Sequence, residues 1–145
     1  MSIRLKSAGL AAVVALLVAG PAFATGSAVA PDGSCDVNHG QAVFKKFCAL
    51  CHVSDKNAKS TLGPNLWGVV GRHVGQVKDF TRYTKAMRDS DVVMTKENLD
   101  QYLKQPQTFI PKNGMTFIGL PKEEDRADVI CFLGTLSDDG HSAGN

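Results

Sequence analysis

The sequence predicts an all-α domain of three main helices joined by long loops. Apolar residues recur at helical spacing at about residues 40–51, at 96–104, and from 121 to 136. No convincing alternation of apolar and polar residues, the pattern of a half-buried strand, separates them. Gly- and Pro-rich turns lie between the helices instead. Because such loops add little apolar surface, we expect something besides side chains to fill the centre of the domain.

The first 24 of the 145 residues predict a cleaved secretory signal peptide. Two basic residues precede an apolar run at 10–18, and Ala22-Phe23-Ala24 ends it with small residues at alternate positions. A retained membrane anchor is the alternative, but the run is far short of the ~20 residues that a span needs. We therefore expect a flexible leader at 25–38, the folded domain at 39–136 and a polar tail at 137–145.

The charge balance argues against a nucleic-acid partner. The chain has 16 Lys and Arg against 14 Asp and Glu, a formal charge of +2. Residues 1–24 contain two basic and no acidic residues, so the mature chain is predicted to have 14 of each. Proteins that bind nucleic acid concentrate a basic stripe instead. After cleavage of the signal peptide we also expect no stable membrane insertion.

Each helix has local signals of its own. The first is expected to bury one face, and Thr95 suits the N-cap of the second, which Pro106 prevents from continuing. The third is predicted to begin at Pro121, with acidic residues at 123–125 favouring the positive end of the helix dipole. The apolar faces consist of Val43, Phe44, Phe47 and Cys48 on the first helix, Leu99 and Leu103 on the second, and Val129, Ile130, Phe132, Leu133 and Leu136 on the third.

Cys48-Ala49-Leu50-Cys51-His52 is the C-x-x-C-H pattern of covalent haem attachment. One helical turn brings the two thiols to the same side, and the adjacent imidazole can then ligate the iron. A redox dithiol is one alternative, but it would follow a strand in a βαβ setting. A zinc site is another, but it lacks a fourth ligand, and the adjacent Cys51 and His52 cannot easily bind one ion.

Together with further motifs, this pattern makes the chain resemble the class I cytochromes c from about residue 40 to 136. The resemblance implies one covalently bound haem c per chain and a single-electron carrier rather than an enzyme. It implies that the first and last helices cross at Gly40, Phe44 and Phe132. The supporting segments, in the order of the family, are residues 63–68, 69–72, 83–86, 102–106, 110–115 and 117–119.

The resemblance also implies roles for single residues. Cys48 and Cys51 would form the thioethers, and His52 and Met115 would be the axial ligands of the iron. The carbonyl of Pro64 would accept the other imidazole N–H. Four further residues are expected at the haem: Arg72 and Tyr83 at its propionates, Tyr102 near the methionine sulfur, and Phe117. Met87 and Met94 are assigned to the core, and His39, His73 and His141 to solvent.

The chain departs from the family in three respects, one of which is an extra residue between Phe80 and Tyr83. Met94 stands where many members have a tryptophan that reaches a propionate. Many relatives also surround the exposed haem edge with lysines, of which this chain keeps Lys59 and Lys122. We therefore expect docking to depend weakly on salt. The matching positions without lysine are Phe47, Thr61, Gln107, Thr108, Gly114 and Pro121.

Two further cysteines, Cys35 and Cys131, lie outside the haem motif. Cys131 falls on the side of the last helix opposite its apolar stripe, and a free exposed thiol fits poorly in an oxidising compartment. Since the first and last helices should cross, we expect a Cys35–Cys131 disulfide. The alternative is two unpaired thiols.

The sequence thus predicts a periplasmic, monomeric, monohaem cytochrome c. Its expected partners are redox proteins: a quinol-oxidising complex, a periplasmic dehydrogenase or a terminal oxidase. One alternative is a haem enzyme or ligand sensor with a labile sixth position, which Met115 argues against. Another is a haem module docked permanently to one dehydrogenase.

Overall fold

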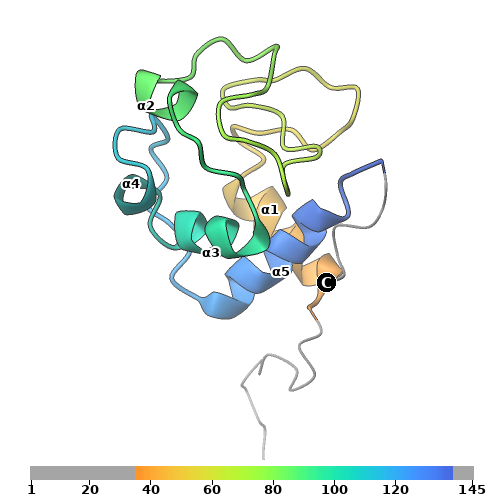
Figure 1. Cartoon of the computed structure of the whole chain (residues 1–145). Coiled ribbons are helices and arrows are strands. Elements are labelled where there is room, and N and C mark those ends of the chain that lie inside the picture. Colours follow the sequence, from red (N-terminus) through yellow and green to blue (C-terminus); the bar gives the residue numbers. More distant parts are fainter. Residues whose placement is uncertain (1–34, 139–145) are drawn as a thin grey trace, which may run out of the picture.

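The computed structural model describes residues 35–138, and in this range the secondary structure is helical. No strand occurs here, although an isolated antiparallel bridge pairs His73 with Val93. The all-α prediction is confirmed. The predicted signal peptide, most of the leader and residues 139–145 lie outside the described residues. The helices are α1 (Val37–Phe47), α2 (Lys85–Arg88), α3 (Lys96–Lys104), α4 (Pro106–Phe109) and α5 (Glu123–Gly134) (Figure 1).

Helix α1 differs from its predicted range of 40–51 at both ends. It begins earlier because the carboxylate of Asp36 caps it, accepting the N–H groups of Asn38 at 2.8 Å and His39 at 3.0 Å. It ends at Phe47, where the N–H of Ala49 bonds back to the carbonyl of Phe44 and interrupts the regular i→i−4 series. The C-x-x-C-H motif therefore lies in the turn after the helix.

Helix α3 has the predicted bounds, and its N-cap Thr95 accepts the N–H of Asn98. Helices α2 and α4 are absent from the prediction because each has four residues, too short for a periodic pattern. Thr84 caps α2, and Pro106 occupies the first turn of α4. Pro106 thus ends one helix and begins the next.

Helix α5 begins at Glu123, two residues later than predicted, and keeps the acidic first turn. The buried guanidinium of Arg126, 4% exposed, fixes this end of the helix. Its Nε donates to Asp100 of α3 at 2.6 Å, and its Nη1 donates to the carbonyls of Leu120 and Pro121 at 3.0 Å. These bonds join α5, α3 and the preceding loop into one unit.

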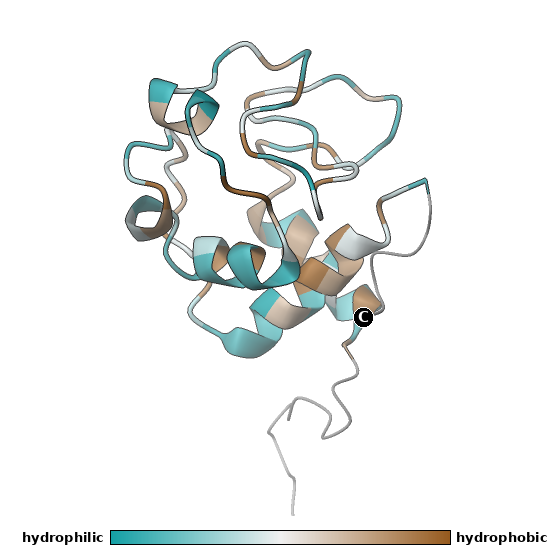
Figure 2. Cartoon of the chain, viewed as in Figure 1, coloured by the Kyte–Doolittle hydropathy of each residue, from teal (hydrophilic) through white to brown (hydrophobic). Residues whose placement is uncertain are grey.

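The crossing of α1 and α5 is the main helix contact within residues 35–138. The Cα of Gly40 lies against the backbone of Asp128 so closely that a Cβ there would overlap its carbonyl oxygen. The rings of Phe44 and Phe132 lie 5.4 Å apart, as expected for this crossing. Figure 2 shows hydrophobic residues of α5 where it passes α1 and α3. Among residues 35–138, no helix is both long enough and apolar enough to span a bilayer.

Candidate functional site

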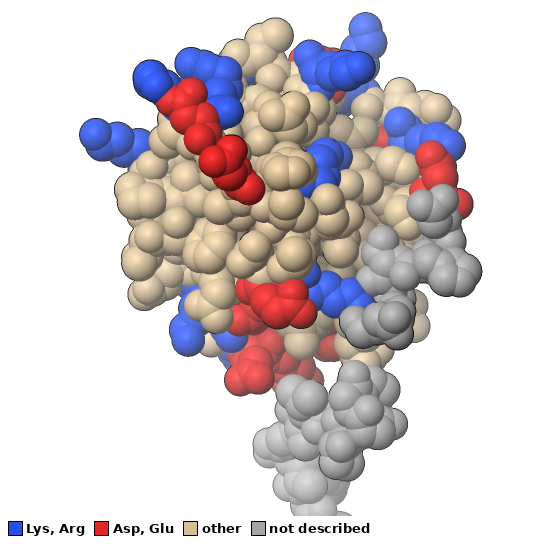
Figure 3. Space-filling model, in the orientation of Figure 1, with Lys and Arg blue, Asp and Glu red and all other residues tan. Residues whose placement is uncertain are grey.

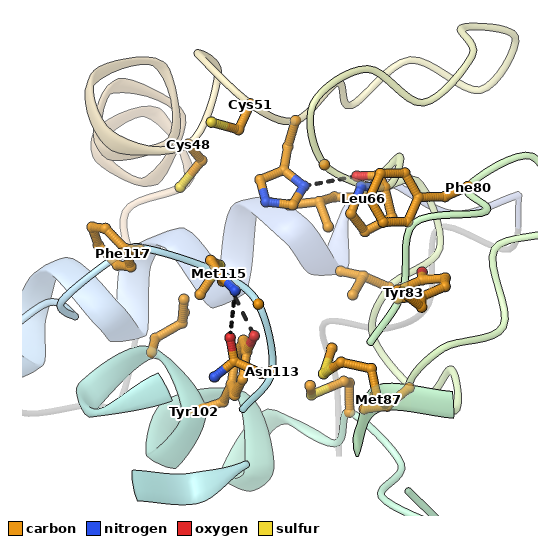
Figure 4. Close-up of a pocket in the computed structure, with 18 of the residues that line it drawn as sticks. Cys48, Cys51, Leu66, Phe80, Tyr83, Met87, Tyr102, Asn113, Met115 and Phe117 are labelled. Carbon is orange, nitrogen blue, oxygen red and sulfur yellow. Dashed lines mark hydrogen bonds between the residues drawn. The ribbon is translucent and has the colours of Figure 1, made fainter. Parts of the chain in front are cut away.

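A cavity of about 790 Å³ lies between the end of α1, helix α3 and the loop that follows α4. Its volume is within the roughly 300–1,000 Å³ that is usual for cofactor sites. Figure 4 shows Cys48 and Cys51 on one side of it and Met115 with Tyr102 on the other. The structure brings all nine predicted site residues together around this cavity: Cys48, Cys51, His52, Pro64, Arg72, Tyr83, Tyr102, Met115 and Phe117.

The imidazole of His52 is held in one orientation and one tautomer. Its Nδ1 lies 2.7 Å from the carbonyl oxygen of Pro64. Since a carbonyl oxygen only accepts, Nδ1 carries the proton and Nε2 keeps its lone pair. Burial lowers the pKa of His52, and the bond to Pro64 opposes this. The ring is therefore neutral near pH 7, the state that binds a metal.

Gly63 supports this histidine, a role that the sequence prediction missed. A Cβ at Gly63 would overlap the ring atoms of His52, so only glycine allows the imidazole its place. The N–H of Gly63 also donates to the carbonyl of Cys51, at 2.6 Å. Gly63 lies in a Gly- and Pro-rich turn and begins the supporting segment 63–68, but neither signal indicated its contact with the histidine.

The two thiols of the C-x-x-C-H motif lie on one side of the cavity and are not joined to each other. The N–H groups of Cys51 and His52 both donate to the carbonyl of Cys48, at 3.0 and 2.9 Å, which closes the turn. Burial, and to a lesser extent the neighbouring Cys51, raises the pKa of Cys48 to about 11. Cys48 is therefore a neutral thiol at pH 7.

Asn113 fixes the backbone of Met115 opposite the histidine. Its Oδ1 accepts the N–H of Met115 at 2.7 Å, and its Nδ2 donates to the carbonyls of Pro106 and Ile110 at 2.8 and 2.9 Å. All its side-chain hydrogen-bonding atoms are used, as a buried amide requires. Asn113 lies in the supporting segment 110–115, but the sequence did not predict this role.

The hydroxyl of Tyr102 points to the sulfur of Met115 at 3.9 Å. Burial raises the pKa of Tyr102 to about 12, so the hydroxyl keeps its proton and donates weakly to the thioether. The contact predicted from the resemblance is present.

Arg72 and Tyr83 line another part of the cavity. The guanidinium of Arg72 donates to the carbonyls of Trp67 at 2.6 Å and Asn65 at 2.9 Å. Burial lowers the pKa of Arg72 and raises that of Tyr83, and the attraction between the two groups opposes both shifts. Met94 is buried beside them and holds the Arg72 backbone, because its N–H donates to the Arg72 carbonyl at 2.9 Å.

The donor set fits a covalently bound haem. A neutral imidazole and a thioether face one largely apolar cavity, and two thiols lie on its wall. Residues 37–137 match the family Cytochrome c. The chain belongs to the cytochrome c family. Family members are electron-transfer proteins with covalently bound haem c, so this cytochrome c is a monohaem electron carrier and not an enzyme.

Relatives from distant organisms show the same similarity. The chain is 42% identical to a cytochrome c of Chlamydomonas reinhardtii over 106 residues, which cover 73% of this chain and 92% of the relative. It is 43% identical to a cytochrome c type-1 of Ascaris suum over 103 residues, which cover 71% and 88%. A cytochrome c homolog of Bradyrhizobium diazoefficiens is 38% identical over 102 residues, which cover 70% of this chain and 55% of that protein.

A Gly63→Ala substitution tests whether this glycine holds the histidine. The added methyl group is expected to displace the ring of His52, to lower the free energy of unfolding by about 1–3 kcal/mol and to alter the haem absorption spectrum. Denaturant titration and visible spectroscopy of the haem-loaded protein measure both effects.

Gly68→Ala is the control. Gly68 has a φ of 64° and nothing within 4 Å of the place that an added methyl group would take, so only backbone strain is added. We expect a small loss of stability and an unchanged spectrum. An unchanged spectrum in Gly63→Ala as well would contradict the role of Gly63.

Proposed function

We propose that His52 and Met115 are the two axial ligands of the haem iron and that Cys48 and Cys51 form the thioethers. The bond from His52 Nδ1 to the Pro64 carbonyl carries this proposal, because it leaves Nε2 free on the side of the cavity that Met115 shares. The haem supplies a one-electron couple at its iron.

The chain's own residues keep this site in one geometry. Pro64 orients the imidazole, Asn113 holds the backbone of Met115, and Tyr102 donates weakly to its sulfur. Apolar side chains form most of the cavity wall. A methionine opposite a histidine raises the reduction potential relative to two histidines. It also fills the sixth position, which favours electron transfer over a haem enzyme or ligand sensor.

Three further residues complete the proposed haem environment. Arg72 and Tyr83 bind the propionates, whose charge needs compensation near apolar surface, and Phe117 packs against the haem. The carbonyls of Trp67 and Asn65 use two of the five N–H donors of Arg72. Met94 has no side-chain N–H or O–H group and leaves the propionates to these neighbours.

The ligand role of Met115 is tested by visible spectroscopy. The ferric protein is expected to show the weak methionine–iron band near the red end of the visible spectrum, and Met115→Ala is expected to lose it. Met87→Leu is the matched control, since Met87 lines the same cavity and should leave the band in place. Retention of the band in Met115→Ala would exclude Met115 as the ligand.

We further propose that the mature protein is periplasmic and contains a Cys35–Cys131 disulfide. The basic and apolar leader supports export. The Cα atoms of the two cysteines lie 6.3 Å apart, with their sulfur atoms at bonding distance, which supports the disulfide. It would close a sequence separation of 96 residues and tie the start of α1 to α5.

Alkylation without reductant tests the disulfide. Mass spectrometry of the native protein is expected to find neither Cys35 nor Cys131 labelled, and to find both labelled after reduction. The double variant Cys35→Ser/Cys131→Ser is expected to unfold at a lower denaturant concentration. In the chain-entropy model, its free energy of unfolding falls by up to about 4–5 kcal/mol. Two labelled cysteines in the unreduced protein would contradict the proposal.

The partners we propose are a quinol-oxidising complex, a periplasmic dehydrogenase or a terminal oxidase, which a monomeric cytochrome would meet in turn. Leu50, Leu62 and Ile118 are 86%, 64% and 91% exposed, and all three lie at the cavity. Exposed apolar side chains here support docking by shape and apolar contact rather than by a ring of lysines.

Salt dependence tests this mode of docking. The rate at which membranes of the source organism reduce the ferric protein should change little with ionic strength. Ile118→Lys adds a charge beside the cavity and is expected to make the rate depend more steeply on salt. A steep fall of the wild-type rate between low and high salt would contradict apolar docking.

A further inference from the structure

A second cluster of metal-ligating side chains lies where α1 crosses α5, outside the haem cavity. His39 of α1 faces Glu124, Asp125 and Asp128, all from the first half of α5. None of the four lines the cavity. Figure 3 shows acidic side chains gathered in the region where Figure 1 places the start of α5.

The imidazole of His39 is exposed to solvent, as expected, and also contacts carboxylates of α5, which the sequence did not predict. Its Nδ1 lies 2.7 Å from Oδ2 of Asp128, and its Nε2 lies 3.6 Å from Oδ1 of Asp125. The other oxygen of Asp128 accepts the N–H of Asp36 at 2.9 Å, which holds that carboxylate in place. Asp128 is buried, whereas the His39 side chain is 41% exposed and open to solvent.

We propose that His39, Glu124 and Asp128 bind a divalent transition-metal ion of the Zn²⁺ class. One nitrogen of His39 and one carboxylate oxygen each from Glu124 and Asp128 already lie within 4.8 Å of one another. Neighbouring ligands of a tetrahedral ion are about 3.4 Å apart when each bond is about 2.0–2.2 Å long. Small side-chain movements would bring the three ligand atoms to this spacing, and water would complete the coordination of the ion.

The chemistry of the cluster selects the class of ion. An imidazole with carboxylates suits zinc and its neighbours, whereas Mg²⁺ and Ca²⁺ prefer oxygen ligands alone. Asp125 adds a third negative charge on the Nε2 side of the ring. The ligands come from two helices, so the bound ion would join α1 to α5 and stabilise the folded state.

Binding must displace a proton when His39 is charged. The hydrogen bond to Asp128 raises the pKa of His39, and the charges of Asp128, Asp125 and Glu124 act in the same direction. The imidazolium form therefore persists to higher pH than in an ordinary histidine. Because metal ligands must be deprotonated, zinc binding should release protons to the buffer.

Isothermal titration of the ferric, haem-loaded protein with ZnCl₂ tests the proposal. The wild type is expected to bind one ion at this cluster, and His39→Gln and Glu124→Gln to weaken that binding by about tenfold or more. His73→Gln is the matched control, because His73 is an exposed histidine at the haem cavity, outside this cluster, and should leave the affinity unchanged. MgCl₂ should give no comparable binding.

Thermal unfolding gives a second measurement on the same proteins. Zinc should raise the unfolding midpoint of the wild type and of His73→Gln, but not that of His39→Gln, and should leave the haem absorption spectrum unchanged. Wild-type zinc affinity in both His39→Gln and Glu124→Gln would overturn the proposal. So would equal binding of Mg²⁺, or loss of binding in His73→Gln.

Discussion

A cavity of about 790 Å³ occupies the place where a helical domain normally has its core, and the rest of the fold is arranged around it. The three longer helices have 11, 9 and 12 residues, too few to fill that space with side chains. The wall of this cavity is largely apolar, and covering it with a bound group removes apolar surface from water, which stabilises the folded state. The haem is therefore part of the core as well as the redox group.

Outside the cavity, the contact between α1 and α5 joins the first and last helices of the domain. Gly40 lets the two backbones approach, and Phe44 packs on Phe132. Arg126 then joins α5 to α3, whose Tyr102 reaches the sulfur of Met115. The helix crossing is thus connected to the proposed ligand Met115 through a few side-chain contacts.

The sequence predicted a feature best where the residues that signal the feature are also the residues that form it. Thr95 and Pro106 set the limits of α3, and the haem motif pointed to the cavity that four of its five residues line. Three features that depend on contacts beyond the local sequence pattern were missed. Gly63 matters because of a ring eleven residues earlier, Asn113 because of the loop it closes, and His39 because of carboxylates on α5. Helices of four residues such as α2 have no periodic pattern to reveal them.

Hydrogen exchange on the chain with and without attached haem tests most directly whether the haem completes the core. In the haem-loaded protein, we predict strong protection of the amides of α1, α3 and α5 and a single cooperative unfolding transition. In Cys48→Ala/Cys51→Ala, prepared without haem, we predict that this protection and this cooperativity are lost. Native-like protection of all three helices in the haem-free chain would contradict the account.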